Sequence, residues 1–302
     1  MNKKPLKKSL KKVITDIENR SSDWPSKVIL NTGFYKLDEC LASGMLTIIA
    51  GTPGIGKTSL ALDITRSLAL SAKSIGYISM GESEENLISR LISPLAKVFM
   101  WKIRTGKISS EELSSIKIAS SKIADLSIFI SDVSSPSLNK VIDIAKDMDC
   151  VHKLDLLIID YLQLIEEKEG SPDFGEKRVE KIKSLARRLN IPVLLLVQAK
   201  EILKEGNNNL RMLRRIENIE KVADVIIFIN RFEEENNINT ELLIEHNRLG
   251  STGKMDLFFD PLLSTFNIPV NSVDNMVESK PPVNFLSRFE EKCRNILNKI
   301  IR

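Results

Sequence analysis

Residues Gly51 to Thr58 have the types and spacing of a loop that binds phosphate. Its members are Gly51, Thr52, Pro53, Gly54, Ile55, Gly56, Lys57 and Thr58. The run follows an apolar stretch and opens a stretch of helical period, which is the context that a Walker A loop requires. Glycines let backbone N–H groups wrap phosphate oxygens, and the start of a helix favours an anion. Lys57 would reach the β- and γ-phosphates of ATP, and the Thr58 hydroxyl would bind Mg²⁺. The alternative is a glycine-rich strand-to-helix turn without a ligand.

Asp160 is the second residue that could bind the metal. It ends the apolar run Leu154-Asp-Leu-Leu-Ile-Ile-Asp160, as the acid of a Walker B element does. Such an acid holds magnesium through water. It could instead cap the turn that follows, but the P-loop upstream favours magnesium. ATP and Mg²⁺ are therefore the expected cofactors.

Composition and length limit the classes of protein. The chain has 302 residues, of which 42% are hydrophobic and 28% charged, as is typical of a folded globular protein with one main domain. It has no run of roughly 18 apolar residues and no apolar signal core after the Lys-rich start, so we expect a cytoplasmic protein without a membrane span. Three scattered cysteines and two isolated histidines argue against a disulfide framework or a zinc site. The net charge of +4 permits an acidic partner but does not require one.

Apolar runs alternate with segments of helical period through the main domain. The expected strands are Leu46–Ala50, Ile75–Ser79, Ser127–Ser131, Leu154–Ile159, Val193–Val197 and Val225–Ile229. The expected helices are Thr58–Leu70, Glu84–Val98, Leu138–Asp149 and Lys177–Leu189. This order predicts an α/β fold with a mostly parallel sheet flanked by helices. Two later runs, Glu241–Ile244 and Asp256–Phe259, predict a C-terminal antiparallel hairpin.

Three regions are expected along the chain. Residues 1–30 should form a basic amphipathic helix and a linker, because apolar residues recur there every three or four positions. Residues 31–269 form the main domain. Residues 270–302 begin as a polar linker with two adjacent prolines and end in a second amphipathic helix, which either packs on the core or docks a partner.

Five further blocks carry a resemblance to a known family. They are Thr32-Gly-Phe-Tyr-Lys-Leu-Asp38, Asp160-Tyr-Leu-Gln-Leu164, Ile219-Glu-Lys-Val-Ala-Asp-Val225, His246-Asn-Arg-Leu-Gly250 and Asp256-Leu-Phe-Phe-Asp260. Together with the P-loop, they resemble in order and spacing the C-terminal motor domain of DnaB-type replicative helicases, which belong to the RecA-like ATPases. The resemblance covers roughly residues 10 to 268.

The resemblance implies a RecA-like P-loop NTPase fold with a twisted sheet, assembled as a homohexameric ring with ATP between subunits. It implies an ATP-driven helicase that moves 5′-to-3′ on single-stranded DNA and meets other replication proteins. Lys57, Thr58 and Asp160 would bind ATP and magnesium. Arg248 would be the arginine finger that contacts the γ-phosphate held by a neighbour. Gln198 would sense that phosphate, although Val197 and Ala199 around it differ from the family's pattern.

The family's DNA contacts come from two loops, expected here near Ile165–Arg178 and Ile202–Arg215. The candidate DNA-binding residues are Lys204, Arg211, Arg214 and Arg215. They would contact the phosphate backbone without reading sequence, so binding would be sensitive to salt. Basic clusters of this size also occur on inert solvated faces.

The chain departs from the family in three places. The family's catalytic glutamate falls at Gly81, and Glu82 follows one position later. A bulge would let Glu82 reach the attacking water, whereas strand alternation would turn it away. His246 stands where the family has a lysine, which removes a charge near neutral pH. The sequence also shows no counterpart of the helical domain that precedes the linker in full-length relatives.

Three functional hypotheses follow. The first is the replicative helicase, with Glu82, Gln198 and Arg248 as its catalytic residues. The second is a nucleotide-binding paralogue with weak hydrolysis that joins or regulates a replication complex, as Gly81 and His246 suggest. The third is a RecA-like recombination ATPase, which the blocks Asp160–Leu164 and His246–Gly250 fit less well.

Overall fold

The structure, a computed structural model, describes residues 30–166, 174–199, 219–234, 237–248 and 250–269. The amphipathic helices expected near the two ends of the chain lie outside these residues. So do the four candidate DNA-binding residues Lys204, Arg211, Arg214 and Arg215. These expectations therefore stay predictions.

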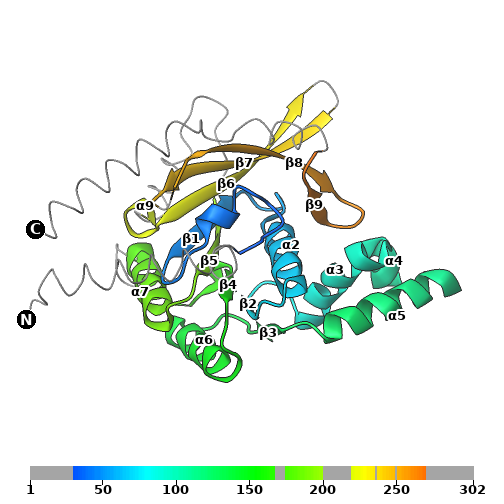
Figure 1. The fold of residues 1–302 in the computed structure, drawn as a ribbon, viewed down its shortest axis with the longest axis horizontal. Coiled ribbons are helices and arrows are strands. Elements are labelled where there is room, and N and C mark those ends of the chain that lie inside the picture. The colour runs from blue at the N-terminus through cyan, green and yellow to red at the C-terminus, as the bar shows by residue number, and fades with distance from the viewer. Residues whose placement is uncertain (1–29, 167–173, 200–218, 235–236, 249, 270–302) are drawn as a thin grey trace, which may run out of the picture.

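A nine-stranded sheet crosses the described part of the chain in the order β3-β2-β4-β5-β1-β6-β7-β8-β9 (Figure 1). Its strands are β1 (Leu46–Gly51), β2 (Ile75–Ser79), β3 (Ile128–Asp132), β4 (Leu156–Asp160), β5 (Val193–Gln198), β6 (Val225–Glu234), β7 (Asn237–Asn247), β8 (Gly253–Asp260) and β9 (Thr265–Asn267). Strands β1 to β6 pair in parallel, and β7, β8 and β9 continue the sheet antiparallel. The predicted α/β class, mostly parallel sheet and C-terminal antiparallel strands are confirmed.

Helices cover both faces of the parallel part of the sheet. They are α2 (Lys57–Leu70), α3 (Glu84–Ala96), α4 (Met100–Thr105), α5 (Ser110–Ala124), α6 (Leu138–His152), α7 (Phe174–Leu189) and α9 (Ile219–Val222), with the 3₁₀ turns η1 (Asp38–Cys40) and η2 (Leu162–Leu164). Figure 1 shows α6 and α7 on one side of the sheet and α2 and α3 on the other. In the part of the chain described here, no helix has the length and apolar character needed to cross a bilayer.

Each face of the sheet has its own hydrophobic core. Ile49 and Ile158 belong to the core under α2 and α3. Their chain neighbours Ile48 and Ile159 point the other way and belong to the core under α6 and α7. Because successive side chains of a strand alternate between faces, a sheet buried on both faces needs uninterrupted apolar runs. This is why the strands could be found in the sequence as apolar runs.

Helices α4 and α5 were not among the predicted elements. The sequence of α5, SEELSSIKIASSKIA, is rich in serine, and Ala119 is its buried residue. A weak apolar stripe gives little helical periodicity. Its start nevertheless carries a capping box, in which Ser109 and Glu112 bond to each other's backbone N–H groups. That pair was the available sequence evidence for the helix.

A buried carboxylate fixes strand β9 to helix α2, directly behind the phosphate loop. Asp63 of α2 accepts hydrogen bonds from the backbone N–H of Phe266 (2.6 Å), the hydroxyl of Thr265 (2.7 Å) and the guanidinium of Arg66 (2.6 Å). Burial raises the pKa of Asp63, and the charge of Arg66 opposes that shift. The anchor places the Phe266 ring against Gly56, where an added Cβ would lie 2.7 Å from the ring.

Replacing Asp63 with alanine should destabilise the chain by about 1–3 kcal/mol, because the buried donors of Thr265 and Phe266 lose their acceptor. Urea denaturation would measure the change. Asp143→Ala is the matched control, since it removes an exposed partner of Lys146 and should leave stability almost unchanged. Equal stability of the two variants would contradict the anchoring role.

Candidate nucleotide-binding site

The P-loop runs from the end of β1 at Gly51 to the start of α2 at Lys57. Gly54 and Gly56 have φ angles of +74° and +109°. Glycine adopts such angles without the steric cost that a side chain would bring. The glycines of the motif thus allow a tight loop that ends at a helix N-terminus, where backbone N–H groups favour an anion.

Lys57 lies folded over this loop. Its ammonium donates to the carbonyl oxygens of Gly51 (3.0 Å) and Thr52 (2.8 Å). Burial lowers the pKa of Lys57, and the negative charge of Asp160 raises it. A buried ammonium held by neutral carbonyls can move to a phosphate anion, which offers it a stronger, charge-assisted hydrogen bond.

Thr58 and Asp160 meet at the base of the loop. The Thr58 hydroxyl donates to Asp160 Oδ2 at 2.8 Å, and the Tyr77 hydroxyl donates to the same oxygen at 2.8 Å. Burial raises the pKa of Asp160, and these two hydrogen bonds lower it. Asp160 makes no capping bond to η2, so the capping alternative has no support. A hydroxyl and a carboxylate side by side are the oxygen ligands that magnesium prefers, so the residues fit the ion.

Glu82 reaches the same region through a turn. The Ser79 hydroxyl donates to the Glu82 carbonyl (2.6 Å) and accepts from the Glu82 N–H (3.2 Å), which folds the chain back after β2. The Glu82 carboxylate then pairs with Arg90 of α3. Arg90 in turn donates to Ser59 of α2 at 2.7 Å. Strand alternation ends before Gly81 and does not decide the direction of Glu82.

Two carboxylates therefore share this end of the sheet. The charge of Glu82 is among the causes that raise the pKa of Asp160, after burial and against the hydrogen bonds from Tyr77 and Thr58. Ser79 and Asp160 are partners in the β2–β4 ladder. Glu82 is thus placed on the side of the sheet end that holds the P-loop.

Gln198 lies at the end of β5, opposite Gly51 in the β1–β5 ladder. Its backbone N–H donates to the Gln163 side-chain oxygen at 3.0 Å, and its carbonyl accepts from the Gln163 amide at 3.0 Å. The residue is therefore adjacent to the first residue of the P-loop. The chain that follows it from residue 200 lies outside the described residues.

Arg248 is not brought to this site. Its backbone N–H donates to the Asp224 carbonyl (2.8 Å) and its guanidinium to the Lys221 carbonyl (3.1 Å). Asp224 also accepts from the N–H of Leu46, the first residue of β1. Leu46 and Gly51 are the two ends of β1, so Arg248 lies near the end of the sheet opposite its own P-loop. With its side chain 47% exposed, it faces outward.

His246 lies near the end of the antiparallel strand β7, two residues before Arg248. It is the partner of Ile226 in the β6–β7 ladder, close to the irregular register between Ile226 and Ile227. Its Nε2 atom is buried and has no hydrogen-bond partner among the described residues. His246 therefore lies near Arg248 and not beside the P-loop.

Several side chains around the loop were missed by sequence reasoning. Arg231 of β6 donates to the carbonyl of Ile55 at 3.1 Å and lies over the Phe259 ring at 5.0 Å. Burial lowers the pKa of Arg231. Tyr77 was hidden within an apolar run, and Arg90 within an amphipathic helix. Neither position differs in sequence pattern from an ordinary structural residue.

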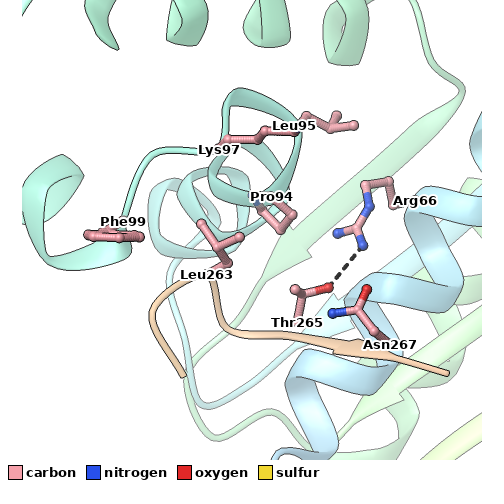
Figure 2. Close-up of a pocket in the computed structure, with 8 residues that line it drawn as sticks. All are labelled: Arg66, Pro94, Leu95, Lys97, Phe99, Leu263, Thr265 and Asn267. Atoms are coloured by element: carbon pink, nitrogen blue, oxygen red, sulfur yellow. Dashed lines mark hydrogen bonds between the residues drawn. The ribbon is translucent and has the colours of Figure 1, made fainter. Parts of the chain in front are cut away.

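A pocket of about 400 Å³ lies elsewhere, beside α2, α3 and β9 (Figure 2). It is lined by Arg66, Pro94, Leu95, Lys97, Phe99, Leu263, Thr265 and Asn267. Arg66 points toward Thr265 across it and donates to the threonine hydroxyl at 3.2 Å. The pocket contains none of the P-loop residues and neither Asp160 nor Glu82, so it is separate from the nucleotide site.

Comparison with known proteins shows the family of the chain. Residues 30–268 match the family described as the DnaB-like helicase C terminal domain. The chain belongs to this family. Curated relatives include a probable plasmid replicative DNA helicase of Chlamydia muridarum, which is 34% identical over 252 residues, 79% of this chain and 54% of that protein. The replicative DNA helicase DnaB of Rickettsia typhi is 30% identical over 283 residues, 78% of this chain and 56% of the relative.

The chain thus spans about half the length of the curated relatives it matches. Among solved structures, an ATPase domain aligns with a TM-score of 0.77 at 23% identity, covering 89% of this chain and 100% of that one. A DnaB-like replicative helicase, studied with its interactions with primase, aligns with a TM-score of 0.74 at 22% identity, covering 84% of this chain and 65% of that one. These similarities confirm the RecA-like fold expected from the sequence.

Proposed function

We propose that this chain is the motor of an ATP-dependent replicative DNA helicase that moves 5′-to-3′ on single-stranded DNA as a ring. One observation carries the proposal: Lys57, Asp160 and the other nucleotide residues gather at one end of the sheet, while Arg248 is exposed at the opposite end. In this proposal one chain supplies two parts of a nucleotide site that it cannot bring together by itself. A head-to-tail ring places the two halves of neighbouring chains together.

Within one chain, the P-loop would bind the phosphates of ATP. Lys57 would move from its carbonyl partners to the β- and γ-phosphates, while Thr58 and Asp160 hold Mg²⁺. The ion supplies positive charge that offsets the charge developing on the transferred phosphate. Glu82 would accept a proton from the attacking water, which is the role that its position beside Asp160 supports. Its partner Arg90 keeps the carboxylate at that place.

From the neighbouring chain, Arg248 would contact the γ-phosphate. Its own carboxylate partner, Asp224 at 3.8 Å, is also bound by the buried ammonium of Lys183. A carboxylate neutralised by a second cation holds the guanidinium less strongly. Arg248 is therefore available to a phosphate on another chain.

Single-stranded DNA is the proposed track. Gln198 would pass the state of the γ-phosphate to the chain that follows it, where Lys204, Arg211, Arg214 and Arg215 are the candidate contacts. Lysine and arginine bind backbone phosphates without reading base sequence, and each contact releases counterions. Binding through backbone phosphates suits a motor that must move along DNA of any base sequence.

The second candidate is a paralogue that binds nucleotide, hydrolyses it weakly and joins a replication complex. Gly81 occupies the catalytic position, and His246 replaces a lysine near the finger. The ion pair between Glu82 and Arg90 also favours this reading, because Arg90 occupies the carboxylate that would otherwise contact the attacking water.

Hydrolysis separates the two candidates. Lys57→Ala should abolish nucleotide binding, whereas Glu82→Gln should retain binding and reduce DNA-stimulated turnover by about 10²–10⁴-fold, the usual contribution of a general base. Steady-state ATP hydrolysis with and without single-stranded DNA measures both. Glu85→Gln is the control, because Glu85 is an exposed carboxylate in the first turn of α3. Tight nucleotide binding by the unmodified chain without turnover would instead favour the paralogue.

Arg248 should act on the neighbouring chain. Arg248→Ala should reduce turnover by about 10³-fold or more, as the loss of an arginine finger does. Mixing Arg248→Ala with Lys57→Ala subunits should restore part of the activity, because some interfaces then combine an intact P-loop with an intact finger. Arg188→Ala removes an exposed arginine of α7 as a control. Full hydrolysis by Arg248→Ala would rule out the assignment.

Magnesium binding should depend on Asp160. In the unmodified chain, chelating Mg²⁺ with EDTA should weaken ATP binding, whereas in Asp160→Asn it should change binding little because the carboxylate ligand is already lost. Fluorescence titration with a labelled ATP measures both affinities. Asp155 directly precedes β4, at the end of the strand opposite Asp160, so Asp155→Asn should respond to EDTA like the unmodified chain. A full EDTA response in Asp160→Asn would exclude Asp160 as a ligand.

A further inference from the structure

The chain contains two glutamines, and they bond to each other. The Gln163 side-chain oxygen accepts the backbone N–H of Gln198, and the Gln163 amide donates to the Gln198 carbonyl, both at 3.0 Å. A primary amide offers one donor edge and one acceptor edge, as a peptide group does. One side chain thus satisfies both polar groups of the Gln198 backbone on that side.

This pair takes the place of a strand ladder that has ended. Strands β4 and β5 pair as far as Ile159 and Leu195, and β4 stops at Asp160, where the chain turns into η2. On the other side, Gln198 faces Gly51 in the β1–β5 ladder. The backbone of Gln198 is therefore held between the first residue of the P-loop and the side chain of Gln163.

The short segment Tyr161–Leu164 contacts the other parts of the site as well. It is joined directly to Asp160. A Cβ on Gly81 would lie 3.3 Å from the Tyr161 ring and 3.5 Å from a Leu164 methyl, so the turn that carries Glu82 packs on the same segment. A shift of Asp160 would consequently move the turn that carries Glu82 and, through Gln163, the end of β5.

We propose that Gln163 is a positioning residue that couples nucleotide and metal occupancy at Asp160 to Gln198 and to the chain beyond it. The inference rests on the proposed function, because it needs a DNA-binding response to ATP. Because Gln163 holds both the N–H and the carbonyl of Gln198, the end of β5 follows η2 when η2 moves. Without this bond the P-loop, Lys57 and Asp160 stay intact and β5 keeps its pairing with Gly51, but the end of β5 loses its link to η2 and hence to Asp160.

The alternative is that Gln163 only fills the gap left by the strand ladder. Its loss would then lower stability and nucleotide affinity, with the effect of ATP on DNA binding unchanged. A coupling measurement separates the two roles, because coupling is the factor by which one ligand changes the affinity of the other.

The experiment uses the full chain and two substitutions. Gln163→Leu keeps the approximate size of the side chain and removes both bonds. Gln163→Glu keeps the acceptor for the Gln198 N–H and loses the donor to its carbonyl. Asn139→Leu removes an exposed amide from α6 as a control. For each protein, the affinity for fluorescein-labelled oligodeoxythymidine is measured with and without a non-hydrolysable ATP analogue and Mg²⁺, together with the affinity for the analogue.

The unmodified chain and Asn139→Leu should bind DNA more tightly with the analogue, by a factor within the usual range of about 5–150 for coupled sites. In Gln163→Leu this factor should fall towards 1, by up to about ten-fold, as expected for the loss of two neutral hydrogen bonds. This variant should keep its affinity for the analogue. The coupling factor of Gln163→Glu should lie between those of the unmodified chain and Gln163→Leu.

An unchanged coupling factor in Gln163→Leu overturns the inference and leaves the proposed function standing. Equal losses of analogue affinity and thermal stability, with coupling retained, overturn it in favour of the filling role. If Gln163→Leu fails to fold, Gln163→Glu decides by the same criteria. Failure of the unmodified chain to bind DNA refutes the proposed function itself, which is a separate outcome.

Discussion

The site depends on a carboxylate buried at the end of a parallel strand. Asp160 is 5% exposed, and a buried carboxylate is costly unless it is paired or hydrogen bonded. The fold supplies the two donors, Tyr77 from the adjacent strand β2 and Thr58 from the first turn of α2. These contacts require β2 next to β4 and the P-loop helix above both. The order of the central strands and the start of α2 are thus tied to one oxygen atom.

The direction of the strands determines what a single chain can do. Because β1, β2, β4 and β5 are parallel, their carboxyl ends meet at one edge, and the P-loop, Asp160 and Gln198 lie there together. The antiparallel strand β7 returns to the opposite edge, where Asn247 faces Val225 and Arg248 follows. A group at that edge lies away from the P-loop of its own chain. The proposed contact between Arg248 and a neighbour's nucleotide therefore rests on this topology.

Sequence patterns predicted the elements whose signal is local. The apolar runs of β1 to β6 reflect burial on both faces, and the P-loop is a contiguous motif. The setting of Glu82 depends on Ser79, nearby in sequence, and on Arg90 from the next helix, and strand alternation suggested no turn. Tyr77 could not be distinguished from core residues, because its hydroxyl acts on a residue far along the chain. Helix α5 was missed because most of its surface is exposed.

The glycine at position 81, just before Glu82, has a steric explanation. A side chain at Gly81 would begin 3.3 Å from the Tyr161 ring, which is tighter than ordinary contact, so the ring would have to yield. Tyr161 follows Asp160 and cannot move without disturbing the segment that holds Gln198 through Gln163. A glycine at 81 avoids that conflict, and the Ser79 turn then carries the next residue back toward the site. The packing of Tyr161 and Leu164 thus favours glycine at position 81.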